Sequence, residues 1–160
     1  MIAAAEHAAQ LPAFASLGEA KATLYRERDR LLAELAKFAL ESNGFDCTFR
    51  PDTLKALEAW YFQLLDDDAF TVMPRRKLER CIAVYFGEVL VRSLHFEWVV
   101  SEYTFSPGRY ELGVRQALLS VMLTGPKRPD PRERSGRMQS LWREYLRYRQ
   151  CGAGSRPRPQ

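Results

Sequence analysis

The chain has 160 residues, of which 46% are hydrophobic, and this is enough apolar material for one compact domain with a sizeable core. Its formal net charge is +4, and no apolar run approaches the roughly 18–20 residues of a membrane-spanning helix, which excludes membrane insertion. Cys47, Cys81 and Cys151 match neither a disulfide framework nor a zinc site, and the N-terminus lacks the basic start of a signal peptide, so we expect a cytoplasmic protein.

The first strong element in chain order is a long helix that begins at Ser16. Ser16 and Glu19 have the spacing of a capping box, in which each side chain satisfies an amide at the helix start. Leucine and phenylalanine then recur at helical spacing as far as Asn43 and Gly44, an Asn-Gly stop signal. We expect residues 1–15, which precede this helix, to be flexible.

A second and a third helix are expected in the middle of the chain. Residues 45–49 alternate apolar and polar side chains, which predicts a short strand, and Pro51 and Asp52 then open a helix that ends at Asp66. After a brief extended segment, a helix from about Pro74 to Leu94 is apolar around most of its circumference. Such a helix belongs at the centre of the fold.

The pattern after the central helix predicts a hairpin. Residues 96–105 read as a strand whose change of phase indicates a bulge near Ser101. A turn at 106–109 leads into a return strand over 110–114, and we expect a short helix over 115–124. Together these elements predict an α+β fold with a small antiparallel sheet, a central buried helix and several packed helices.

The C-terminal part of the chain is basic and rich in proline. Residues 126–136 read as a linker, and Ser135 then caps a last helix. From residue 127 onward ten lysines and arginines face three acids, giving +7, so residues 1–126 carry −3. We therefore divide the chain into a core domain, a proline-linked basic helix and flexible termini. Their ranges are 16–125 for the core domain, 126–150 for the basic helix, and 1–15 and 151–160 for the termini.

Gly87 and Glu88 stand out within the central helix because they interrupt an apolar stretch. Glycine costs about 1 kcal/mol relative to alanine inside a helix, so Gly87 indicates a neighbouring backbone too close for a Cβ. A buried Glu88 needs a partner, and Arg92 lies four residues later in the preferred order. We interpret Glu88 and Arg92 as a structural ion pair rather than as a catalytic acid and its modulator.

No pattern in the chain predicts catalysis. The histidines are His7 and His95, and neither has a partner that spacing would identify; Cys81 lies in an apolar helix. Phosphate-loop, dinucleotide and metal motifs do not occur, and the contiguous side chains of Asp66–Asp68 diverge too much for a calcium loop. We expect a protein that is not an enzyme, with no catalytic residues, no metal site and no cofactor.

The run from "YFGEVL" (85–90) to "FEWVV" (96–100) resembles a pattern in small uncharacterised bacterial proteins, in which a YFGE helix leads into a tryptophan-containing strand and a hairpin. Some of these resemble cytoplasmic immunity proteins of polymorphic or contact-dependent toxins. The segment "TFRPDTLKALEAW" (48–60) is similar to the strand-then-helix start of such proteins. The resemblance covers roughly residues 45–114 and implies that the partner is a toxic effector.

Two charge clusters lie at helix ends where the helix dipole disfavours their charge. Asp66–Asp68 end one helix and Arg75–Lys77 begin the next, each the wrong sign for its helix dipole. Either the clusters neutralise each other across the junction, or a charged partner docks there. We expect a protein-binding module, for example an immunity or inhibitor protein that captures a basic effector. The acids expected to bind the partner are Asp66, Asp67, Asp68, Glu97, Glu102 and Glu111.

A nucleic-acid-binding function is the alternative that the basic C-terminal region suggests. Arginine side chains neutralise phosphates, and aromatic side chains offer stacking surfaces for bases. The arginines concerned are Arg143, Arg147 and Arg149, with Trp142, Tyr145 and Tyr148 between them. Because Trp142 and Tyr145 also fall on the apolar stripe of the last helix, this hypothesis ranks below protein binding.

Overall fold

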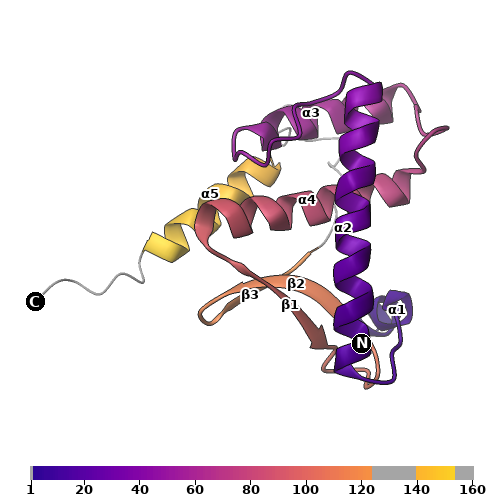
Figure 1. The fold of residues 1–160 in the computed structure, drawn as a ribbon, viewed down its shortest axis with the longest axis vertical. Coiled ribbons are helices and arrows are strands. Elements are labelled where there is room, and N and C mark those ends of the chain that lie inside the picture. Colours follow the sequence, from indigo (N-terminus) through magenta and orange to yellow (C-terminus); the bar gives the residue numbers. More distant parts are fainter. Residues whose placement is uncertain (1, 124–139, 154–160) are drawn as a thin grey trace, which may run out of the picture.

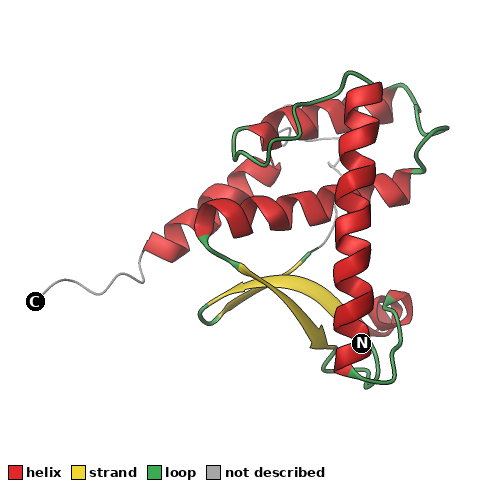
Figure 2. Ribbon diagram, viewed as in Figure 1, coloured by secondary structure: helices red, strands yellow, loops and turns green. Residues whose placement is uncertain are grey.

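A computed structural model describes residues 2–123 and 140–153, which form five helices and a three-stranded antiparallel sheet (Figures 1 and 2). The predicted α+β fold is confirmed. In Figure 1, helix α4 lies between the sheet on one side and helices α3 and α5 on the other, and α2 crosses α4. The helices are α1 (Ile2–Gln10), α2 (Leu17–Glu41), α3 (Thr53–Asp66), α4 (Arg75–Leu94) and α5 (Ser140–Ala153). The strands are β1 (Glu97–Glu102), β2 (Tyr110–Gln116) and β3 (Leu119–Met122).

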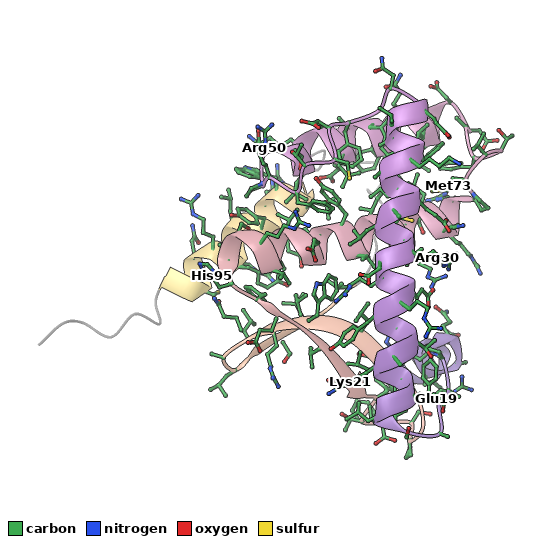
Figure 3. All side chains as sticks on the ribbon, viewed as in Figure 1. Glu19, Lys21, Arg30, Arg50, Met73 and His95 are labelled. Atoms are coloured by element: carbon green, nitrogen blue, oxygen red, sulfur yellow. The ribbon has the colours of Figure 1, made fainter. Side chains whose placement is uncertain are left out.

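Helix α4 is the central helix that its sequence predicts. Met73 and His95 mark its two ends in Figure 3. The hydroxyl of Tyr85 accepts a hydrogen bond from the backbone N–H of Phe49 at 3.0 Å, and the ring of Phe86 lies 6.3 Å from that of Tyr148 on α5. Successive residues of α4 thus face different elements, and the helix is apolar around most of its circumference because other elements surround most of it.

Helix α2 begins at the capping box and ends at the Asn-Gly signal that its sequence predicts. Ser16 Oγ accepts a hydrogen bond from Glu19 N at 3.2 Å, while the Glu19 carboxylate reaches back to Ala15 N at 3.1 Å. At the C-terminal end Asn43, not Gly44, adopts the left-handed conformation, with φ of 51°. Gly44 is needed for a different reason, because a Cβ there would lie 2.6 Å from the Trp60 ring.

The first hairpin is regular, and the predicted bulge near Ser101 is wrong. The register runs without a break from Glu97 opposite Arg115 to Glu102 opposite Tyr110. Strand β1 therefore ends at Glu102, three residues before the predicted end, and the change of phase in the sequence marks the start of the turn. The Tyr103 ring then packs edge-on against that of Phe105 within this turn.

Two further local predictions are wrong for related reasons. In the segment expected to be a helix, residues 115–123 form none: β2 continues to Gln116, Ala117 turns the chain with φ of 51°, and β3 pairs back onto β2. Whether such an apolar run forms a helix or a strand depends on whether a neighbouring strand is available to pair with it. Conversely, no strand pairs with residues 45–49, so this segment is irregular although its apolar side chains still pack against the core.

Both ends of the described chain are more structured than the sequence predicts. The alanine-rich start forms α1, and Tyr110 N then donates to Pro12 O at 3.1 Å, so the segment after α1 lies along β2. Helix α5 belongs to the same core as residues 16–125, because Tyr145 and Tyr148 are buried in that core. The predicted linker over 126–136, with Ser135 as its cap, lies outside the described residues, as does the tail after residue 153.

Candidate functional site

The six acids expected to bind a partner do not share one surface. Asp66 is the last residue of α3 and Asp67 and Asp68 follow it, whereas Glu97, Glu102 and Glu111 belong to the β1–β2 hairpin. Helix α4 separates α3 from the sheet (Figure 1). The six acids therefore lie in two separate parts of the molecule.

Two of the hairpin acids have structural roles. The Glu102 carboxylate accepts a hydrogen bond from Gly108 N at 2.6 Å, which closes the hairpin turn. The Glu111 carboxylate lies 2.9 Å from His7 Nε2, and its side chain is only 12% exposed. Glu97 is exposed and stands opposite Arg115 in the register. The hairpin therefore offers little free negative charge.

The α3–α4 connection, taken as residues 66–74 with the last residue of α3 included, carries the negative charge of Asp66–Asp68, and the cations that follow do not neutralise it. Arg75 pairs with Glu79 at 2.9 Å and Lys77 pairs with Glu34, so the two clusters do not form ion pairs with each other. Asp66–Asp68 are exposed and form no ion pair with any residue that the structure describes. Val72 in the same connection is 77% exposed. Three unpaired carboxylates thus lie in the same short segment as an exposed apolar side chain.

Glu88 and Arg92 form the ion pair that their spacing predicts. Arg92 Nε lies 2.8 Å from Glu88 Oε1, and the other carboxylate oxygen accepts a hydrogen bond from Trp98 Nε1 at 2.8 Å. The Arg92 guanidinium also lies 4.0 Å from the centre of the Phe49 ring. These contacts hold the indole of β1 against α4, which is a structural role.

Gly87 has a close neighbour, but that neighbour is a side chain rather than a backbone. A Cβ at Gly87 would lie 2.6 Å from Trp98 Cη2 and 2.7 Å from Leu123 Cδ1. Gly87 therefore leaves room for the Trp98 ring, and the carboxylate of Glu88 accepts the hydrogen bond from the N–H of the same ring. Together they explain why a Gly-Glu pair precedes the tryptophan-containing strand.

The three arginines of the nucleic-acid hypothesis are exposed on α5, but the aromatic residues beside them are not free. Tyr145 and Tyr148 are buried, with relative exposures of 4% and 8%. The Trp142 ring stacks on that of Tyr145, and Lys55 Nζ lies 4.5 Å from its centre. Arg143, Arg147 and Arg149 can thus contact phosphate, whereas the neighbouring rings are used in packing.

Glu58 is a buried carboxylate that sequence reasoning missed. It is 1% exposed and accepts hydrogen bonds from Ser140 N at 3.0 Å, Ser140 Oγ at 2.5 Å and Leu141 N at 3.1 Å. A carboxylate at this position satisfies free amides at the start of α5 and complements its dipole. The signal in the sequence was its place on the apolar face of α3, three residues before Tyr61.

A cavity of about 210 Å³ lies between α2, α4, β2 and residues 7–12. Its wall is apolar and includes Leu24, Leu31 and Val84. Polar side chains also line it: Arg28, the ion pair Glu27–Arg80 and the hydrogen-bonded pair His7–Glu111, and each of the two pairs joins two elements. Sequence reasoning missed this cavity because its residues come from five separate segments, the fifth being Leu123 after β3.

The Tyr61 hydroxyl and the Cys81 thiol are held in their neutral forms by burial. Burial, together with the Glu79 carboxylate that accepts its hydrogen bond at 2.6 Å, raises the pKa of Tyr61 to about 12. Burial raises the pKa of the Cys81 thiol to about 11, which makes it a poor nucleophile. Across residues 2–123 and 140–153, no three His, Cys, Asp or Glu side chains group as metal ligands, and no helix has the length and hydropathy to cross a bilayer.

Comparisons with known proteins place the chain in a family. The family model described as "Uncharacterised protein YwmA" matches residues 13–149, from the segment that lies along β2 to the last turns of α5. A Bacillus subtilis (strain 168) protein described as "Uncharacterized protein YwmA" is 31% identical over 114 residues, which are 69% of this chain and 72% of that protein. No solved structure matches the chain. Since the family model covers most of the chain, including the sheet, the central helix and α5, this protein belongs to the YwmA family.

Proposed function

We propose that this protein is a non-enzymatic binding module that captures a basic partner protein through the α3–α4 connection. The observation that supports this proposal is the unpaired charge of Asp66–Asp68 in the same segment as the exposed side chain of Val72. Protein interfaces commonly combine an apolar centre with a polar rim. An acidic rim would accelerate encounter with a basic partner.

The electrostatics of the connection favour a cationic partner. Carboxylates at the C-terminal end of a helix face the negative end of its dipole, which costs some stability. Of the nearby cations, Arg75 and Lys77 are already paired with Glu79 and Glu34. Arg76 is exposed and forms no ion pair with Asp66–Asp68, so none of the three cations offsets this cost directly. A lysine or arginine from a partner would do so.

The class of partner that we propose is a basic toxic effector, of the kind that immunity proteins bind in the cytoplasm. The resemblance over residues 45–114 supports this choice. The free thiols of Cys47, Cys81 and Cys151 are consistent with a reducing compartment. The hairpin acids Glu102 and Glu111 are not part of the proposed surface, because the turn and α1 use them.

The test compares two triple variants that change net charge equally. Asp66, Asp67 and Asp68 are replaced by Asn, and in the control Asp29, Glu41 and Asp46, which are also exposed, are replaced by Asn, Gln and Asn. The partner is first captured from host lysate at low salt and identified. We expect the first variant to associate on the order of tenfold more slowly at low salt, with a weaker dependence on salt.

The control should associate nearly as fast as the unmodified protein. Equal slowing by both variants would show that only net charge matters and would contradict the proposed surface. Stopped-flow or surface-based association kinetics at several salt concentrations give the answer. A failure to capture any protein would also contradict the proposal.

The alternative of nucleic-acid binding is supported by the exposure of Arg143, Arg147 and Arg149 on one helix. If these arginines neutralise three phosphates, replacing them by Gln should reduce the slope of log K against log salt by about 3 on plain duplex DNA. Nuclease-sensitive capture together with this loss would favour the alternative over the acidic surface.

A further inference from the structure

We propose that the cavity between α2, α4, β2 and residues 7–12 binds a small apolar carboxylate, an aromatic or branched short-chain acid, whose carboxylate is held by Arg28. This site is independent of the proposed protein-binding surface. It lies on the sheet side of α4, whereas the α3–α4 connection follows α3 on the other side (Figure 1).

The size of the cavity sets the size of the ligand. Its volume is about 210 Å³. An engineered apolar cavity of about 150 Å³ takes up benzene, and pockets for drug-sized ligands begin near 300 Å³. The cavity therefore suits one ring or one branched chain with a single polar group, roughly ten heavy atoms in all.

The wall of the cavity selects an apolar body. Leu24 and Leu31 project from α2 and Val84 from α4, and each is at most 7% exposed. Tyr110 and Leu112 of β2 line the same space. A ring placed among these side chains is removed from water, which is the main source of binding free energy for a small apolar ligand.

The free hydrogen-bond donors at the cavity select an anion. Glu27 is already paired with Arg80, and the Glu111 carboxylate lies 2.9 Å from His7 Nε2. Arg28 uses Nε for Asp29, an exposed neighbour, and its other guanidinium donors make no hydrogen bond with the described residues. A carboxylate is the group whose two oxygens match those remaining donors.

The guanidinium of Arg28 is held in place before any ligand arrives. It lies 4.9 Å from the centre of the Tyr25 ring and 5.3 Å from that of the Trp98 ring, and Tyr25 OH donates to Trp98 O at 3.3 Å. The Arg28 side chain is only 20% exposed. A fixed, partly desolvated guanidinium loses less freedom on binding than a mobile one, so its contribution to affinity is larger.

The experiment uses three probes that share a benzyl group and differ in the polar group: phenylacetate, phenylacetamide and phenethylamine. Binding to the full-length protein is followed by calorimetry and by two-dimensional methyl spectra. We expect phenylacetate to bind about tenfold more tightly than the amide, the amine to bind most weakly, and the methyl signals of Leu24, Leu31 and Val84 to shift.

Two variants with matched controls locate the site. Arg28→Gln should abolish the preference for the acid over the amide, whereas Arg26→Gln, exposed on the same helix, should leave it unchanged. Ala83→Phe should fill the cavity and abolish binding of both probes, whereas Ala33→Phe at an exposed position should not. Circular dichroism shows whether each variant is folded.

Several results would overturn the proposal. These are no binding of phenylacetate at millimolar concentration, equal affinity for acid and amide, an acid preference that survives Arg28→Gln, and methyl shifts confined to other parts of the protein. Should Ala83→Phe fail to fold, the Arg28→Gln comparison and the methyl shifts still decide.

Discussion

At the scale of single residues, the contact between α4 and β1 depends on one missing side chain and one carboxylate. The indole of Trp98 crosses α4 at Gly87, where a Cβ would lie 2.6 Å from the ring, and its N–H is satisfied by Glu88. Arg92 then neutralises Glu88 from one turn further along. A half-buried carboxylate is tolerated here because both of its oxygens have partners.

The first prediction concerns Gly87. Substituting Gly87→Val should lower the free energy of unfolding by about 2 kcal/mol, because the cost of overpacking against Trp98 and Leu123 exceeds the gain in helix propensity. Gly18→Ala is the control, since its nearest neighbour is Ser16 Oγ at 3.9 Å and the added methyl meets open space. That substitution should stabilise the protein by about 0.5–1 kcal/mol in urea unfolding. Equal stabilisation by Gly87→Ala would show that the close contact is absent.

At the scale of elements, the docking of α5 depends on a single carboxylate from α3. Glu58 accepts three hydrogen bonds at the first residues of α5 and is almost fully buried. Beyond this point the helix packs through Leu141, Tyr145 and Tyr148. The arginines between these residues face solvent, so the charge of α5 does not prevent its apolar side from joining the core.

The second prediction follows from this cap. Substituting Glu58→Ala should destabilise the protein by about 3 kcal/mol, because it leaves three donors unsatisfied next to the core. Trypsin should then cleave faster at Arg143 and Arg147, since the start of α5 opens more often. Gln150→Ala, at an exposed position of the same helix, is the comparison. Similar cleavage rates for both variants would mean that the Glu58 hydrogen bonds do not hold α5.

Elements whose limits are encoded locally could be predicted from the sequence, and elements that need a distant partner could not. Ser16 and Glu19 predicted the start of α2, and the apolar circumference of α4 predicted its central place. Residues 45–49 and 115–124 were assigned wrongly because strand formation depends on an available neighbouring strand. The Glu88–Arg92 pair was predictable because it lies within one helix, whereas Glu58 and Ser140 are 82 residues apart.

At the scale of the whole molecule, α5 packs into the same core as the other helices and the sheet, rather than standing apart as a separate basic helix. The core contains residues from α2, α3, α4, the sheet and α5 as one cluster. The cavity likewise draws on segments that are distant in sequence, which is why no local pattern revealed it. We therefore expect folding of the core domain and docking of α5 to be parts of one cooperative process.

The last prediction tests this cooperativity by removing the C-terminal part of the chain. A protein ending at residue 125 should lose its cooperative thermal transition, because Phe86 and Phe96, which now lie beside Tyr148, would be exposed to water. Burying such aromatic side chains contributes about 1.5–3 kcal/mol each, a large share of the stability of a small domain. The control is the full chain with Arg143, Arg147 and Arg149 replaced by Gln, which should melt within a few degrees of the unmodified protein because these side chains are exposed. Calorimetry distinguishes the cases, and an unchanged cooperative transition in the shortened protein would show that residues 1–125 form a self-sufficient core.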